Sequence, residues 1–368
     1  MFESYDPVTY PQSVHFYLNC IPLILQLNKL SMDIELFTTT PQSVEFDRYL
    51  FLKELKRISR QTEKYGYKGI LVYSDNRLAD PWMMTGIILA ETTHLLPMIA
   101  LQPMYLHPYT VAKKIASIGL IYDRAIALNL VAGGFVNDLI AIGDDTPHDK
   151  RYERLAEYAE IIQLLLSTNN AVTYKGEFYE IKNLKLQPVL PEHLQPKYYL
   201  SGSSDMARKT ATRLGAKLIE YPEPIEDYEK SGRSNGNGIR GIRVGILARH
   251  THDKAWIDAQ IRFPKIRSGE LSHQMAKRTS DSEWHKMLSD QNRYDLNDES
   301  VYWLGPFKHY HTFFPYLVGD YEEVARELSG YLQTGCTTCI LDIPISEIDL
   351  QSTLQVFDQA FNYMEKVS

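Results

Sequence analysis

Short apolar runs alternate with longer segments of helical periodicity from Met32 onward. This alternation is typical of repeated βα units, in which each strand of a parallel sheet is followed by a helix. Eight such units favour an α/β fold of the (β/α)8 TIM-barrel type, and a barrel with insertions can hold 368 residues in one domain. The predicted strands are Ile34–Phe37, Gly69–Tyr73, Met98–Leu101, Ala125–Leu130, Tyr198–Ser201, Lys217–Tyr221, Arg243–Ala248 and Cys339–Ile343.

Helices are predicted where Leu, Ile and Ala recur at three- and four-residue spacing. Gly66, Gly215 and Gly335 each follow such a segment and precede a strand, where a left-handed helix cap is expected. The predicted helices are Tyr49–Tyr65, Trp82–Thr92, Pro108–Ile121, Tyr152–Ser167, Asp205–Leu214, Tyr321–Thr334 and Leu350–Met364.

Two stretches break the βα rhythm. Residues 222–238 offer only a short acidic segment and a Gly- and Ser-rich run, which predicts a stunted sixth helix and a loop. Residues 250–315 lack a clear strand, and an insertion there, after the seventh strand, would lie over the C-terminal face of a barrel as a lid. We therefore expect one domain over residues 32–368, preceded by an extension at residues 1–31.

Composition narrows the class of ligand and the compartment. The net charge of −7 shows no basic excess, which favours a small-molecule substrate over nucleic acid or a membrane surface. Three cysteines argue for a reducing, cytoplasmic setting, and the Cys336–Cys339 pair is expected to flank a strand rather than to bind zinc or act in redox chemistry. The most apolar N-terminal stretch, at residues 20–27, is too short to span a bilayer.

Two segments near the middle of the chain carry candidate chemistry. Asn129–Gly134 ends the fourth predicted strand and places an amide and small residues where a planar ring could approach the backbone. Glycines also serve plain turns, so this segment by itself leaves a structural role open. His148 and Tyr152, at the start of the fourth helix, could bind a phosphate or a ring, or could simply form an exposed polar helix start.

A third segment, Tyr199–Ser204, runs from a strand into the helix Asp205–Leu214. Its Gly-Ser-Ser turn presents free N–H groups, two hydroxyls and the positive end of a helix dipole, which suits a phosphate. The alternative is a helix cap by Ser203 or Ser204 without any ligand.

Taken in order, these segments resemble the bacterial luciferase-like flavin monooxygenases, and within them the alkanesulfonate monooxygenase branch. The segments that carry the resemblance are Asn129–Gly133, His148–Tyr152, Ser201–Ser204 and Leu317–Asp320.

The resemblance implies a (β/α)8 barrel of the bacterial luciferase type that binds FMN. In that family a separate NAD(P)H:flavin reductase delivers FMNH2, and O2 adds to it to give a C4a-peroxyflavin that oxidises a small organic substrate. A barrel that excludes water would protect such a species from decay. The resemblance places Ser203, Ser204 and Tyr152 at the FMN phosphate, and Leu101, Gln102, Asn129, Ala132 and His148 near the ring.

The chain departs from the alkanesulfonate pattern at several positions. Thr40 stands where that branch has a His, Leu78 where it has a Cys, and Gly245 where a second His is expected. Arg243 is retained, but the Tyr expected after the last strand is missing. Because a sulfonate needs fixed positive charge, we expect a larger, less anionic substrate, such as a biosynthetic intermediate.

Four residues are candidates for catalysis or substrate binding: Arg243, His309, His311 and Asp342. Because histidine as a residue type titrates near neutrality, His309 and His311 could supply an acid or a substrate-binding cation. Asp342 ends the last predicted strand and could transfer a proton. Exposed loop residues, for the histidines, and a buried salt bridge, for Asp342, are the alternatives.

Two other functions remain open on the same fold. Relatives use the deazaflavin F420 for hydride transfer without oxygen, and other luciferase-like proteins only store flavin. No metal site is expected. The 25 Tyr and 13 Phe residues suggest an aromatic-rich pocket or interface, and we expect a homo-oligomer.

Overall fold

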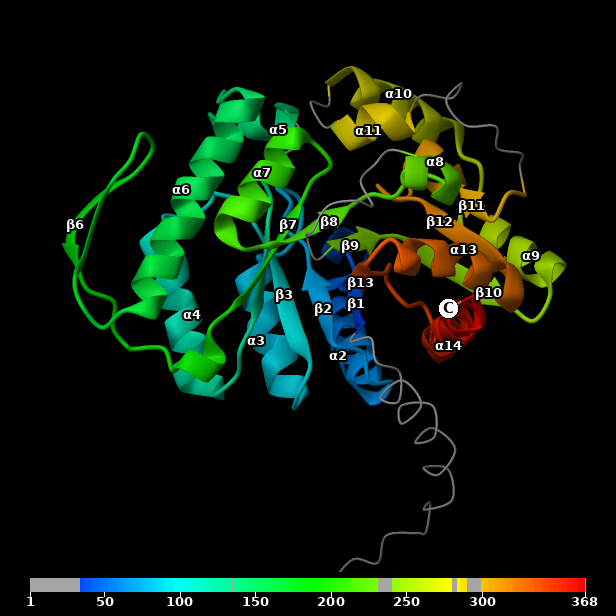
Figure 1. The fold of residues 1–368 in the computed structure, drawn as a ribbon, viewed down its shortest axis with the longest axis horizontal. Coiled ribbons are helices and arrows are strands. Elements are labelled where there is room, and N and C mark those ends of the chain that lie inside the picture. The colour runs from blue at the N-terminus through cyan, green and yellow to red at the C-terminus, as the bar shows by residue number, and fades with distance from the viewer. Residues whose placement is uncertain (1–33, 134–135, 231–239, 280–282, 290–298, 368) are drawn as a thin grey trace, which may run out of the picture.

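Eight parallel strands close a barrel in the computed structural model, which describes residues 34–133, 136–230, 240–279, 283–289 and 299–367 (Figure 1). Around the barrel the order is β1-β13-β9-β8-β7-β4-β3-β2, so all neighbours are consecutive in the chain once the insertions are set aside. The predicted fold class, with an insertion after the seventh strand, is confirmed. The strands are β1 (Glu35–Thr39), β2 (Gly69–Val72), β3 (Leu96–Leu101), β4 (Ala127–Leu130), β7 (Lys197–Ser201), β8 (Lys217–Glu220), β9 (Arg240–Arg243) and β13 (Cys336–Ile340).

Helices cover the outside of the barrel. Gly66, Gly215 and Gly335 have φ values of 74°, 62° and 90°, which confirms the predicted left-handed turns between helix and strand. The covering helices are α2 (Arg48–Lys64), α3 (Pro81–Glu91), α4 (Pro108–Tyr122), α5 (Val136–Ala141), α6 (His148–Ser167), α7 (Asp205–Leu214), α8 (Ile225–Lys230), α13 (Tyr321–Gln333) and α14 (Glu347–Val367). At six residues, α8 is the stunted helix that the sequence predicts. A hairpin of β5 (Val172–Lys175) and β6 (Glu180–Leu184), which the sequence did not predict, projects at the left of Figure 1.

An apolar cluster contributed by strands alone fills the inside of the barrel. Phe37, Met98 and Tyr199 belong to it, and each is at most 1% exposed. A separate cluster between the strands and α4, α6 and α7 buries the outer face. Because the interior is packed, any ligand must bind at an end of the barrel rather than along its axis.

The N-terminal end of the barrel is closed by polar side chains that satisfy one another. Glu35 lies 2.8 Å from Lys197 Nζ and 2.9 Å from Lys217 Nζ, and it accepts hydrogen bonds from Tyr199 and Thr338. Burial alone would raise the pKa of Glu35, but the hydrogen bonds from Lys197, Lys217 and Tyr199 outweigh it and hold the pKa at about 2. This end therefore holds an ionised Glu35 carboxylate whose hydrogen-bond partners all lie within the protein.

The seventh barrel strand was predicted at the wrong place. Arg240–Arg243 pairs with β8 and β13, whereas Gly245–Arg249 (β10) leaves the barrel and pairs with β12 (Tyr316–Asp320). With β11 (Tyr302–Trp303), these two strands form a separate three-stranded sheet. The apolar run after Arg243 is buried in that second sheet, and an apolar run does not show which sheet it joins.

The eighth strand also begins earlier than predicted. It spans Cys336–Ile340, so both cysteines lie within it instead of flanking it. Their Sγ atoms are 4.0 Å apart and both side chains are buried.

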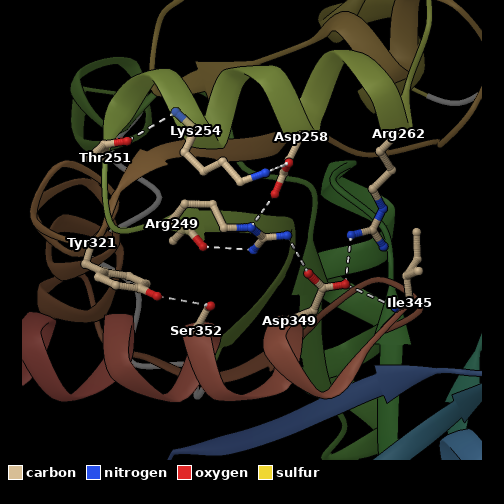
Figure 2. Close-up of polar contacts among 10 residues, drawn as sticks. Arg249, Thr251, Lys254, Asp258, Arg262, Tyr321, Ile345, Asp349 and Ser352 are labelled. Atoms are coloured by element: carbon tan, nitrogen blue, oxygen red, sulfur yellow. Dashed lines mark hydrogen bonds and ion pairs between the residues drawn. The ribbon is translucent and has the colours of Figure 1, made fainter.

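The insertion consists of the small sheet and the helices α9 (His252–Arg262), α10 (Arg267–Thr279), α11 (Glu283–Leu288) and α12 (Gly305–Lys308). Asp349, from α14, anchors its root: Arg249 Nη2 and Arg262 Nη1 lie 3.0 and 3.2 Å from the Asp349 carboxylate (Figure 2). Arg249 also pairs with Asp258 at 2.7 Å. In Figure 1, α10 and α11 lie at the top of the view, on the same side as α5. Among the described residues, no helix is both long and apolar enough to cross a membrane.

Candidate active site

A cavity of about 1370 Å³, part of it open to solvent, lies at the C-terminal ends of the strands. Residues that follow or end seven of the barrel strands line it, which is the face where TIM barrels build their active sites. The insertion contributes Trp284 and Phe313, so it covers part of the mouth, in the place that the sequence predicted for a lid. Ten of the lining residues are Gln42, Tyr73, Gln102, Asn129, Ala132, His148, Tyr152, Ser203, Tyr221 and Arg243.

One corner of the cavity is formed by the turn between β7 and α7. The Ser203 side chain is only 5% exposed, and its Oγ has no hydrogen-bond partner among the described residues. Ser204 caps α7, because its Oγ accepts the Ala207 N–H at 3.1 Å. At Gly202, an added Cβ would come within 2.9 Å of the Tyr152 hydroxyl. The corner thus holds a buried, unused hydroxyl beside the positive end of a helix.

The N-terminal end of α6 faces this corner. His148 and Tyr152 lie one turn apart, with ring centroids 5.3 Å apart in an edge-to-face arrangement. His148 Nδ1 lies 2.9 Å from Asp149 Oδ1, which orients the imidazole. Tyr152 is buried and both side chains line the cavity. The corner therefore has donors on two sides.

The wall next to this corner is built from small residues and amides. Asn129 is 3% exposed, and its Oδ1 accepts a hydrogen bond from Ser201 Oγ at 2.9 Å. Gly133 has a φ of 101°, which a residue with a side chain rarely adopts, and Gln102 lies across from it. The backbone is accordingly accessible to a flat ligand between Gln102 and Gly133.

The floor of the cavity holds a buried guanidinium. Arg243 is 6% exposed, and its Nη2 donates to the Tyr73 hydroxyl at 2.5 Å. The Tyr73 and Phe314 rings lie 5.0 and 4.7 Å from its Cζ. Burial alone would lower the pKa of Arg243, but the nearby hydroxyls of Tyr73 and Tyr221 and the carboxylate of Asp342 outweigh it and raise the pKa. Arg243 is charged at every accessible pH.

The insertion closes over the cavity through aromatic contacts. Trp284 stacks on Tyr221, with a centroid distance of 3.9 Å and an interplanar angle of 11°. Phe313 packs edge-on against Tyr310 at 5.4 Å. Because Tyr221 follows β8 and Trp284 belongs to α11, this stack joins the insertion to the barrel rim.

The structure brings most of the predicted residues to the cavity, but not all. Leu101 and Ser204 lie beside it without lining it; they are buried in β3 and in the cap of α7. Lining residues from the prediction are Gln102, Asn129, Ala132, His148, Tyr152, Ser203 and Arg243.

His309, His311 and Asp342 do not line the cavity. His309 Nδ1 lies 3.5 Å from Glu270, and His311 Nε2 lies 2.9 Å from the Pro264 carbonyl oxygen, so both contact the insertion itself. Asp342 accepts the Tyr316 hydroxyl and lines a separate, smaller pocket beside Arg262 and Tyr316. Asp342 is half-buried, and its partner is the Tyr316 hydroxyl rather than the buried salt bridge that was the alternative.

The lining residues that were not predicted include Tyr73, Tyr221, Trp284 and Phe313. Tyr73 and Tyr221 directly follow barrel strands, and a polar residue at the C-terminal end of a strand was a usable signal. Trp284 and Phe313 had no such signal, because they reach the cavity from an insertion without βα periodicity.

Comparison with known proteins adds a family to this geometry. The sequence profile of the luciferase-like monooxygenases matches residues 32–338. The chain is 34% identical, over 303 residues, to the 4-(gamma-L-glutamylamino)butanoyl-[BtrI acyl-carrier protein] monooxygenase BtrO of Niallia circulans. The match covers 81% of this chain and 89% of that protein.

Solved structures share the fold at low identity. The long-chain alkane monooxygenase LadA superposes with a TM-score of 0.67 at 16% identity, covering 92% of each chain. DmoA from Hyphomicrobium sulfonivorans gives 0.68 at 13%, covering 91% of this chain and 88% of that one. An F420-dependent secondary alcohol dehydrogenase gives 0.62 at 18%, covering 89% and 99%. The match to the family profile and the relative at 34% identity decide the assignment: the chain belongs to the luciferase-like monooxygenase family.

Proposed function

We propose that the protein is a monooxygenase that uses reduced FMN and O2, with FMNH2 delivered by a separate NAD(P)H:flavin reductase. The observation that carries the proposal is the unpartnered, buried Ser203 hydroxyl at the N-terminal end of α7. A buried donor of this kind is costly unless a ligand satisfies it. Its position, facing Tyr152 and His148, suits a phosphate group.

The residues present fit FMN. Ser203 and the N–H groups at the start of α7 would hold the phosphate, together with Tyr152 and His148. Asn129, Ala132 and Gln102 would contact the ring, with Leu101 and Ser204 supporting them from behind. Reduced flavin, when bound, supplies the two electrons with which one atom of O2 becomes water while the other enters the substrate.

The chain itself would position the substrate and keep water out. Trp284 and Phe313 cover the mouth, which limits the access of bulk water to the reacting centre. Arg243 would bind the substrate from the floor. Asp342 would act through Tyr316 and through its field at Arg243, as a positioning residue. His309 and His311 would contribute protons only if the insertion moved toward the cavity.

The relative's name guides the choice of substrate. We infer that this enzyme, too, oxidises an acyl group carried as a thioester, because the two chains match over most of their lengths. A γ-glutamyl group carries a free α-carboxylate at the end remote from the thioester. Such a substrate is larger than a simple alkanesulfonate, and we expect little sulfite release from octanesulfonate.

The experiment supplies FMNH2 through a reductase in air, and reduced F420 without oxygen in a parallel reaction. Incorporation of one labelled oxygen atom from O2 into the pantetheine thioester of 4-(γ-L-glutamylamino)butanoate, only in the first reaction, supports the proposal. Substrate oxidation with F420 alone would replace it by hydride transfer. Tight retention of oxidised FMN without turnover would instead indicate flavin storage, and near-stoichiometric sulfite from octanesulfonate would make alkanesulfonates the substrates.

A further inference from the structure

Arg243 is a buried cation whose surroundings are aromatic rather than acidic. Its Cζ lies 5.0 and 4.7 Å from the centroids of the Tyr73 and Phe314 rings, and the Tyr221 hydroxyl lies nearby. Among the residues that the structure describes, no carboxylate lies within ion-pair distance of its guanidinium. The acid that acts on it from farther away, Asp342, is engaged by Tyr316. The cation is supported by the Tyr73 and Tyr221 hydroxyls and by the more distant Asp342, and a carboxylate in direct contact would be a further, charge-assisted partner.

Two donors of this group remain unused. Arg243 Nε has no hydrogen-bond partner in the described part of the chain. The Tyr73 oxygen accepts from Arg243 Nη2, so its own hydrogen must point elsewhere, and no described residue accepts it. Both residues line the cavity. A guanidinium and a phenol hydroxyl thus belong to the lining of one cavity, although the Nε atom itself is buried.

We propose that Arg243 and Tyr73 form a carboxylate-binding subsite that receives the end of the acyl substrate remote from its thioester. One carboxylate oxygen would accept from the Arg243 guanidinium and the other would accept the Tyr73 hydroxyl hydrogen. The orientation of the substrate, with its thioester end away from this subsite, rests on the proposed function. The subsite itself rests on the two unused donors and on the absence, among the described residues, of a carboxylate in direct contact with Arg243.

The number and kind of donors select the ligand. A carboxylate is planar and presents two oxygens, which matches two donors and one positive charge. A primary amide has no charge, and its NH2 group would face a donor. A sulfonate presents three tetrahedrally arranged oxygens, of which this subsite would leave at least one without a donor.

The test measures binding rather than turnover. Hexanoate, hexanamide and hexane-1-sulfonate are titrated calorimetrically into the protein at pH 7.5, with and without saturating FMN. We expect hexanoate to bind at least ~10-fold more tightly than either of the other two, because only it combines charge with two oxygens. Equal binding of hexanamide would overturn the charge requirement, and equal or tighter binding of the sulfonate would overturn the assignment to carboxylates.

Variants locate the subsite. Arg243→Met should weaken hexanoate binding at least ~10-fold and remove its advantage over hexanamide, and Tyr73→Phe should weaken it about 5-fold while leaving the fold and the ring contact with Arg243 intact. The control Arg326→Gln removes the same charge from an exposed position on α13, and it should change nothing. If both cavity variants bind hexanoate like the wild type, the carboxylate lies elsewhere. A protein that binds hexanoate as expected but fails to oxygenate with FMNH2 would retain this subsite and lose the proposed function.

Discussion

The two ends of the barrel hold buried polar side chains in opposite states. At the N-terminal end, Glu35 binds Lys197, Lys217 and Tyr199, so its charge and hydrogen-bonding capacity are used within the protein. At the C-terminal end, Ser203 Oγ and Arg243 Nε have no partner in the described residues. Both ends are built on the same eight strands. The two ends therefore differ in whether the buried polar side chains find hydrogen-bond partners within the protein.

This contrast separates residues that stabilise the barrel from residues that await a ligand. Where a buried charge has a full set of partners, its removal should change the free energy of unfolding and leave ligand binding alone. Where a buried donor is unused, its removal should change ligand binding and leave stability nearly unchanged. The predictions below test that separation.

The largest effect is expected at Glu35. Since its pKa is about 2 in the folded protein against an ordinary value of 4.5, its ionisation stabilises the fold by about 3 kcal/mol above pH 4.5. Because the folded pKa is the lower one, this stability is lost as the pH falls from 4.5 toward 2. Glu35→Gln should lower the free energy of unfolding in urea by about 2–3 kcal/mol at pH 7, and by much less at pH 3.

A control for Glu35 is Glu322→Gln, which breaks an exposed pair with Arg326 on α13. It should change stability by less than about 0.5 kcal/mol at either pH. An equal loss of stability in both variants would show that the buried cluster around Glu35 stabilises the fold no more than an exposed ion pair does.

At the other end, Gly202→Ala should weaken FMN binding about 100-fold, because the new Cβ would meet Tyr152 Oη at 2.9 Å and the Ala207 Cβ at 2.7 Å. The dissociation constant is measured by quenching of flavin fluorescence. Gly86→Ala, in α3, serves as the control, since its nearest contact would be 3.4 Å. Wild-type FMN affinity in Gly202→Ala would place the phosphate outside this corner.

Ser203 and Ser204 are neighbours with different expected roles. Ser203→Ala should weaken FMN binding about 10-fold without lowering the melting temperature, because its hydroxyl is unused in the protein alone. Ser204→Ala removes the cap of α7 and should cost about 1 kcal/mol of stability. If the two variants exchange these effects, the assignment of cap and ligand donor is reversed.

The smallest effect concerns the cover over the mouth. Trp284→Ala removes the ring that stacks on Tyr221, and about 2- to 5-fold more hydrogen peroxide should form per FMNH2 consumed, because water reaches the site. Trp284→Phe should restore most of the coupling, since a stacking ring remains. Unchanged coupling in the alanine variant would mean that Trp284 does not exclude water.

Sequence periodicity predicted the barrel because strand and helix each repeat at their own period. It failed at Arg240–Arg243, where two arginines in a four-residue strand mask its buried character; both side chains lie inside the protein. It also failed to separate β9 from β10, since burial in a barrel and burial in a small sheet give the same apolar run. The β5–β6 hairpin was missed because its strands alternate weakly and one face is exposed.

Site residues that belong to local motifs could be predicted from the sequence, whereas contacts between residues far apart in the chain could not. Asn129, His148 and Ser203 stand in segments whose local chemistry suits a phosphate and a ring, and the structure brings all three to one cavity. Tyr73 and Arg243 are 170 residues apart, and their contact depends on closure of the barrel. A local sequence pattern cannot predict a contact between two residues so far apart in the chain. The roles of these residues in binding remain predictions.

The passage of the chain from β9 into β10 has a mechanical consequence. Val244 N donates to Ile340 in the barrel, and Gly245 N, one residue later, donates to Pro315 beside the small sheet. Arg243 thus lies one residue before the point where the chain leaves the barrel and enters the insertion. A tilt of the small sheet would be transmitted through two peptide planes to the guanidinium at the cavity floor. The position of the insertion over the cavity mouth would thus influence the position of Arg243 at the floor of the cavity.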